Sequence, residues 1–327
     1  MWSRCHLAPF VSLLAMVLPG QQQEQVLSRE SAFDTNQWNA DIGLGGGAPP
    51  HFPLQPSVAV LLPWAAPDSD ATVADLVLGV RGLLVTGSTM RGGERRAELK
   101  QMVSRIRQLD RSQLTFGERL GTTVLLYDTS VASSYPTLQK LADGFAEQLQ
   151  RELAASTPSA LPAFELLELH LLVERVEGCS PQAPWLRDLR NVAHAATCSD
   201  RPGASRRSDA AQLLVRLLRG EHVPADQLLA VCWPTNPLLD PVHTWLGVLA
   251  AERVTAAERA PLLPQLERLL AARHGEDAGE RAGSWEPAGG LSRAATTAWH
   301  VRSLRQADTL WSVDQRAAAR DRAEVVR

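Results

Sequence analysis

The sequence predicts an all-α protein made of stacked helical hairpins, and three observations predict it. From residue 72 onward, apolar residues recur at spacings of three, four and seven, as in Val73, Leu76, Val77 and Val80, which places them on one helix face. Segments rich in small residues alternate with amphipathic segments at a repeat of about 45 residues, which is typical of helical-repeat proteins. No window alternates β-branched and polar residues as a half-buried strand does.

Eleven segments carry the helical pattern. They are 72–86, 94–109, 117–131, 135–153, 161–176, 185–196, 208–218, 225–232, 240–252, 262–273 and 291–304. The small-residue segments contain Gly79, Gly82, Gly121 and Gly247. Because glycine inside a helix costs about 1 kcal/mol relative to alanine, we expect each to have a close packing partner. The segments 94–109, 135–153 and 262–273 have a charged face, so we expect solvent on one side of them.

Residues 1–20 have the layout of a signal peptide. Arg4 and His6 precede an apolar run over 7–18, which Pro19 and Gly20 end. About twelve apolar residues are too few to span a bilayer, which needs about 20, and they suit a signal-peptide core. The sequence therefore predicts export to the periplasm or the extracellular space, with no membrane span in the mature chain. An uncleaved N-terminal anchor is the alternative.

The segments that flank the helical region have a different composition. Residues 21–70 are rich in Gly and Pro without a helical period, which predicts an irregular arm or linker. The run 58–62 is the one β-like stretch in it, and Trp38 and Trp64 are expected to anchor the arm by burying their rings. Residues 311–327 alternate charge and alanine, which predicts a frayed C-terminal tail.

Composition excludes some classes of partner. The chain has 327 residues with 45% hydrophobic residues and a formal net charge of -3, so it has no strongly basic character and we expect no nucleic-acid partner.

The cysteines leave the question of a disulfide bridge open. Beyond the predicted signal, Cys179, Cys198 and Cys232 allow one disulfide bridge with one free thiol, and burial as reduced thiols is the favoured alternative.

A family resemblance appears in the C-terminal third. Residues 240–247 (DPVHTWLG) begin a predicted helix, residues 283–290 (GSWEPAGG) form a loop, and residues 296–299 (TTAW) begin another small-residue helix. This order resembles the repeat of the squalene cyclase and protein prenyltransferase superfamily, especially its secreted, terpene-cyclase-like members. The resemblance implies an α/α toroid, or a partial toroid, of five to six helical hairpins over residues 71–310.

The loop residues have structural roles by this reading. Gly283 and Ser284 turn the chain after a helix, Trp285 stacks over a helix end, and Pro287 redirects the chain into the next helix. We therefore interpret Trp285 as a repeat-closing residue and not as a ligand contact.

The catalytic motifs that the resemblance implies are not present. Cyclases of the family use an Asp-x-Asp-Asp acid motif, whereas the one Asp-x-Asp here, Asp68-Ser69-Asp70, is predicted to cap a helix. Prenyltransferases hold zinc through an Asp two residues before a Cys, whereas Ala230 stands two residues before Cys232. A zinc set of Cys232, Asp240, His243 and His300 is conceivable, but buried or capping roles are favoured for each. We therefore expect no catalytic residue, no metal and no cofactor.

Five residues lie on the two helices whose family counterparts are inner, so they are the candidates for facing a central cavity. They are Asp240, His243, Trp245, Trp299 and His300. A core histidine remains the alternative for His300.

The favoured function is a non-catalytic exported repeat protein that binds a hydrophobic small molecule or an envelope protein. The alternatives are an enzyme acting on an isoprenoid or other lipid-like substrate, and a structural component of a cell-envelope assembly. The cavity distinguishes them. Apolar and aromatic walls with one acid would favour the enzyme, whereas a centre filled by the N-terminal arm or by arginine side chains would favour scaffolding.

Overall fold

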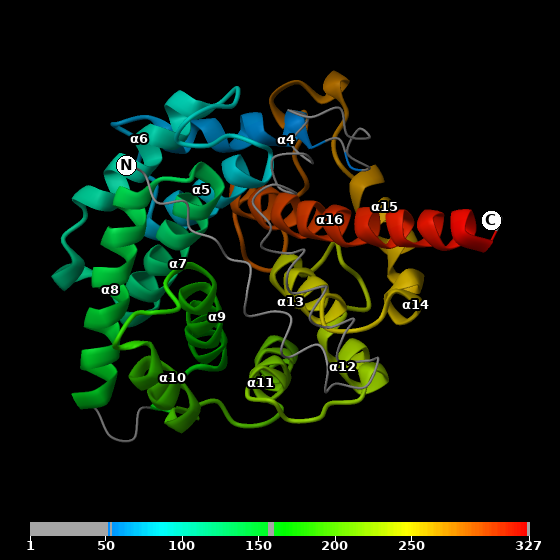
Figure 1. The fold of residues 1–327 in the computed structure, drawn as a ribbon. Coiled ribbons are helices and arrows are strands. Elements are labelled where there is room, and N and C mark those ends of the chain that lie inside the picture. Colours follow the sequence, from blue (N-terminus) through cyan, green and yellow to red (C-terminus); the bar gives the residue numbers. More distant parts are fainter. Residues whose placement is uncertain (1–51, 53, 156–159, 326–327) are drawn as a thin grey trace.

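The structure is a computed structural model that describes Phe52, residues 54–155 and residues 160–325. It confirms the all-α prediction, since helices make up almost all of the regular structure (Figure 1). The predicted signal peptide, most of the predicted arm and Trp38 lie outside the described residues. Within the described part, no helix is long and apolar enough to cross a membrane.

All eleven predicted helices are present. They are α5 (Val73–Val85), α6 (Arg96–Gln108), α7 (Phe116–Ser133), α8 (Pro136–Ala155), α9 (Ala163–Cys179), α10 (Leu186–Ala195), α11 (Arg206–Leu218), α12 (Ala225–Cys232), α13 (Pro241–Ala251), α15 (Leu263–Ala271) and α16 (Arg293–Val325). Capping boxes begin two of them. Thr72 and Asp75 form the first, and Thr115 and Glu118 form the second. Thr72 is thus the cap of α5, and the prediction that Asp68 or Asp70 caps it was wrong.

The segment before α5 differs from the prediction. Residues expected to be irregular or β-like form α4 (Gln55–Val58) and the 3-10 helix η2 (Ala59–Ala65). A methyl group on Gly82 of α5 would lie 2.5 Å from Leu61 Cδ1, so η2 packs directly on that glycine. Tertiary packing therefore holds this Pro-containing segment in a helical form that its own sequence does not favour.

Smaller elements complete the chain. They are η3 (Arg111–Gln113), the strands β1 (Ala160–Leu161) and β2 (Thr197–Cys198), α14 (Ala256–Arg259), η4 (Ala260–Leu262) and η5 (Glu276–Arg281). The two strands form a parallel pair of two residues each. The last helix, α16, continues to Val325 through the segment predicted to fray.

Helix packing follows the alternation predicted from composition. Six helices pack one after another in the order α5, α7, α9, α11, α13 and α16 (Figure 1). The last of them, α16, also packs against α5. The helices α6, α8, α10 and α12 pack on α5, α7, α9 and α11 respectively. Every residue of α13 is buried, whereas α6 keeps a solvent face.

Three of the four helix glycines have the packing partner expected of them. Gly79 lies against Met102 and Trp64, Gly82 against Leu61, and Gly247 against Trp233, where an added methyl group would lie 2.5 Å from the indole ring. Gly121 has no such neighbour, so the expectation was wrong there. Trp64 is thus placed on α5, as expected of a residue that anchors the segment before it.

Candidate functional site

Trp245 of α13 and Trp299 of α16 lie together. Their ring centroids are 5.2 Å apart, and both side chains are buried. Phe164, in the first turn of α9, completes the group at 5.7 Å from Trp245 and 6.3 Å from Trp299. We call Phe164, Trp245 and Trp299 the aromatic triad. It joins three helices that are far apart in the sequence, and two of its members were predicted as cavity-facing residues.

Arg302 stacks on this triad. Its guanidinium carbon lies 3.9 Å from the centre of the Trp245 ring and 5.1 Å from that of Trp299. A guanidinium over an indole face is attracted by the ring quadrupole, and the attraction strengthens where water is excluded. Arg302 lies one helical turn after Trp299, so α16 presents both to the same side.

Three ion pairs link the helices in the neighbourhood of Arg302. Arg81 of α5 lies 3.4 Å from Glu168 of α9, and both side chains are only 7% exposed. Arg175 of α9 lies 2.7 Å from Asp128 of α7. Arg253, which follows α13, lies 2.8 Å from Glu174 of α9. We call these three pairs the central charge network.

The network crosses the space between the helices. Arg81–Glu168 links α5 to α9, although α7 packs between them in the helix order. Arg253–Glu174 links the end of α13 to α9, although α11 packs between those two. Each of these two pairs therefore joins helices that are not neighbours in the packing order. The charges of Arg81, Glu168, Asp128 and Arg175 all act on Arg302 as well.

Asp240 has a capping role. Its carboxylate accepts a hydrogen bond of 2.9 Å from the backbone N–H of His243 at the start of α13. It also forms an ion pair of 2.8 Å with Arg207 of α11. A carboxylate at a helix N-terminus interacts favourably with the free N–H groups there.

The two candidate histidines contact residues outside the central charge network. His243 Nε2 lies 3.0 Å from the carbonyl oxygen of Val231 in α12. The His300 ring packs against Trp285 at 5.3 Å, and neither of its nitrogens has a hydrogen-bond partner in the described part of the chain. Burial lowers the pKa of His300 to about 3, so this imidazole is neutral at pH 7. His300 is fully buried, which agrees with the alternative of a core histidine.

The loop residues make contacts within the fold. Trp285 is buried, and its indole N–H donates a 2.7 Å hydrogen bond to the carbonyl oxygen of Leu269 near the end of α15. Ser284 Oγ donates to the carbonyl oxygen of Arg281, and Gly283 has a φ of 76°. Pro287 is exposed. The loop is thus tied to the end of α15 through Trp285.

The conceivable zinc set does not assemble. Cys232 Sγ lies 3.6 Å from the carbonyl oxygen of Ala210, and burial raises its pKa to about 12. The partners of Asp240, His243 and His300 are those given above. Across the described ranges, no group of three or more His, Cys, Asp or Glu side chains is arranged to hold a metal ion. Cys179, Cys198 and Cys232 are free thiols, so the bridge between Cys179 and Cys198 is not formed.

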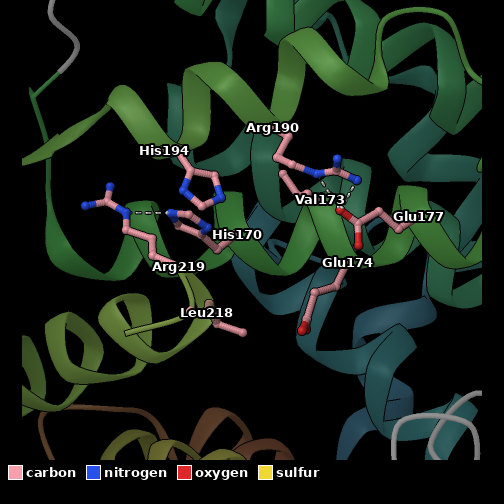
Figure 2. Close-up of a pocket in the computed structure, with 9 residues that line it drawn as sticks. His170, Val173, Glu174, Glu177, Arg190, His194, Leu218 and Arg219 are labelled. Carbon is pink, nitrogen blue, oxygen red and sulfur yellow. Dashed lines mark hydrogen bonds and ion pairs between the residues drawn. The ribbon is translucent and has the colours of Figure 1, made fainter. Parts of the chain in front are cut away.

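A second site, which sequence reasoning missed, lies between α9, α10 and the end of α11 (Figure 2). It is a half-open pocket of about 340 Å³. His170 and His194 meet edge to face at 5.5 Å, Arg219 Nε donates to His170 Nε2 at 3.2 Å, and Arg190 pairs with Glu177 at 2.8 Å. Burial and the nearby Arg219 lower the pKa of His170 to about 4. The polar groups of this pocket are therefore largely satisfied by one another.

The chain was compared with protein-family models, curated proteins and solved structures. No protein-family model, no curated protein and no solved structure matches this chain.

Proposed function

We propose that the chain is a non-catalytic, exported helical-repeat protein that binds a ligand or a protein partner, built as a closed α/α toroid of six helical hairpins. The packing order supports the ring: α5, α7, α9, α11, α13 and α16 follow one another, and the last helix returns to the first. Four of these six helices, α5, α7, α9 and α11, are each paired with the helix that follows in the sequence, and α15 precedes α16 in the sequence.

The observation that carries the non-catalytic assignment is the central charge network. An enzyme that folds or transfers an isoprenoid chain needs an apolar interior, because charged walls would have to be desolvated against a hydrocarbon. Here the interior side chains of α5, α7 and α9 include Arg81, Asp128, Glu168 and Arg175, held in ion pairs. Such pairs stabilise little compared with apolar packing but specify one arrangement of the helices that they join. The interior is thus better suited to a fixed scaffold than to a lipid-like substrate.

The test is a survey of what accompanies the full-length protein. The chain would be purified without detergent from its own host, and bound metabolites and lipids would be identified by mass spectrometry against a mock purification. We expect one stoichiometric compound or one stoichiometric envelope protein. In parallel, the protein would be incubated with linear isoprenoid substrates. Turnover of such a substrate at a rate above that of buffer would overturn the proposal.

A further inference from the structure

Arg302 has no direct ion-pair partner among the described residues. Among the described residues, no carboxylate lies within 4.0 Å of its guanidinium, and none of its N–H groups donates a hydrogen bond to a protein acceptor. Its Nη1 atom is buried without a partner. An unpaired charged donor costs several times more free energy when it is buried than when it is exposed to water. The position therefore calls for an acceptor that the chain itself does not supply.

The charged groups that act most strongly on Arg302 already have partners. They are the Arg81–Glu168 pair and the Arg175–Asp128 pair, and each pair is neutral in sum. Glu252 acts on Arg175 in turn, and its carboxylate accepts a hydrogen bond from Gln306. Nε of Arg81 is a further buried donor without a partner, and so is the indole N–H of Trp245 in the same stack. Three unpaired donors thus belong to Arg302, to the Trp245 ring on which it stacks and to the neighbouring Arg81, and an anion would satisfy them.

Solvent reaches this region. Arg302 is half-buried, and the side chains of Asp128 and Arg175 are 24% and 23% exposed although they lie between the helices. The Trp245 ring covers one face of the Arg302 guanidinium at 3.9 Å, so a small anion that enters here meets the N–H edge of the guanidinium. The aromatic faces hold Arg302 in a fixed orientation, which reduces the ordering cost of binding.

We propose that the interior binds a small organic carboxylate, which the guanidinium of Arg302 holds at the aromatic triad. A carboxylate is planar with two oxygens, so it matches the fork of N–H donors on arginine. It carries one negative charge, whereas a phosphate carries close to two at pH 7, so a carboxylate costs less to desolvate in this partly buried region. This inference rests on the proposed function, since it names the ligand class that the scaffold would hold.

The experiment uses the full-length protein, dialysed into chloride buffer of fixed ionic strength. Acetate, benzoate and inorganic phosphate would be titrated separately, with tryptophan fluorescence and calorimetry as readouts, because Trp245 and Trp299 flank the site. We expect saturable binding of the two carboxylates and weaker binding of phosphate. Arg302→Met keeps the length of the side chain and should weaken carboxylate binding at least about thirtyfold, because it removes a charge-assisted contact.

Two controls keep the result readable. Arg190→Met removes an arginine whose ion pair with Glu177 lies in the other pocket, and it should leave carboxylate binding unchanged. Methyl benzoate has the shape of benzoate without its charge and should not bind. If Arg302→Met does not fold, Arg302→Lys keeps the charge without the fork and should bind carboxylates with intermediate affinity.

Several outcomes would overturn the inference: no carboxylate binding by the wild type, equal binding by Arg302→Met, a preference for phosphate, or equal binding of methyl benzoate. A protein that ignores carboxylates but carries another stoichiometric ligand would overturn this inference alone. Turnover of an isoprenoid substrate would instead overturn the proposed function.

Discussion

At the scale of single residues, burial decides which ionisable groups remain available for chemistry. His300 is fully buried, and the pKa of its imidazole falls to about 3 because its charged form is desolvated. Cys232 is fully buried too, and the pKa of its thiol rises to about 12 for the same reason. Both residues stood in the conceivable zinc set, and both behave instead as neutral core side chains at pH 7.

The buried His300 makes the stability of the protein depend on pH. The unfolded chain binds a proton at this imidazole below about pH 6.5, whereas the folded chain binds it only below about pH 3. Lowering the pH from 7 to 4 therefore favours unfolding, by about 3 kcal/mol for this group. We expect His300→Leu to remove this part of the pH dependence in urea unfolding, although the variant is less stable at pH 7.

His222→Leu is the matched control, because that histidine is exposed. It should show the same loss of stability between pH 7 and pH 4 as the wild type. Identical pH dependence in the wild type and His300→Leu would contradict the buried, neutral placement of His300.

At the scale of elements, the segment of α4 and η2 depends on its docking site. The backbone of Pro56 in α4 lies so close to Gly283 that a methyl group there would overlap the Pro56 carbonyl. We expect Gly283→Ala to lower the free energy of unfolding, both because φ is 76° and because α4 must move. Urea unfolding measures this loss, with Gly290→Ala as the comparison.

Gly290→Ala separates the two causes. Gly290 has a φ of 79°, but a methyl group there would meet no atom within 4 Å. It should therefore cost about 1 kcal/mol through backbone strain alone. Gly283→Ala should cost roughly 1–3 kcal/mol more than that. Equal losses in the two variants would show that the contact between α4 and the loop contributes nothing.

The elements also indicate where sequence reasoning succeeds. The helix pattern was sufficient for all eleven predicted helices, because apolar residues recur at helical spacing in each of them. It failed for η2, whose helical form depends on Leu61 meeting Gly82 across the fold. The continuation of α16 had a local signal that was overlooked, since residues 293–327 contain neither Gly nor Pro.

The candidate site was only partly predictable. Trp245 and Trp299 stood at the starts of presumed inner helices, and the structure brings them together. Arg81 and Glu168 also carried a signal, because each is a lone charge in an otherwise apolar stretch of helix, where burial requires a partner. Nothing local marked Phe164 or Arg302. Their roles depend on how α9 and α16 meet, which no single segment encodes.

At the scale of the whole molecule, α16 joins the two ends of the helix order. It packs against α13, which precedes it, and against α5, which begins the order. In an open array of repeats, removing the last helix would cost one neighbouring interface, and the remainder would still fold cooperatively. In a closed ring the same removal costs two interfaces and exposes the buried faces of both α5 and α13.

Truncation distinguishes the two arrangements. A chain that ends at residue 292 lacks α16, and we expect it to lose the single cooperative transition of the full chain in urea, with separate changes in helix content and tryptophan fluorescence. A chain that ends at Trp311 keeps the described side-chain contacts of α16 with α13 and α5, so it is the matched control and should unfold in one transition near the wild-type midpoint. One cooperative transition with only a small shift in the shorter chain would mean that α16 ends an open array. The contact between α16 and α5 would then be incidental to the stability of the fold.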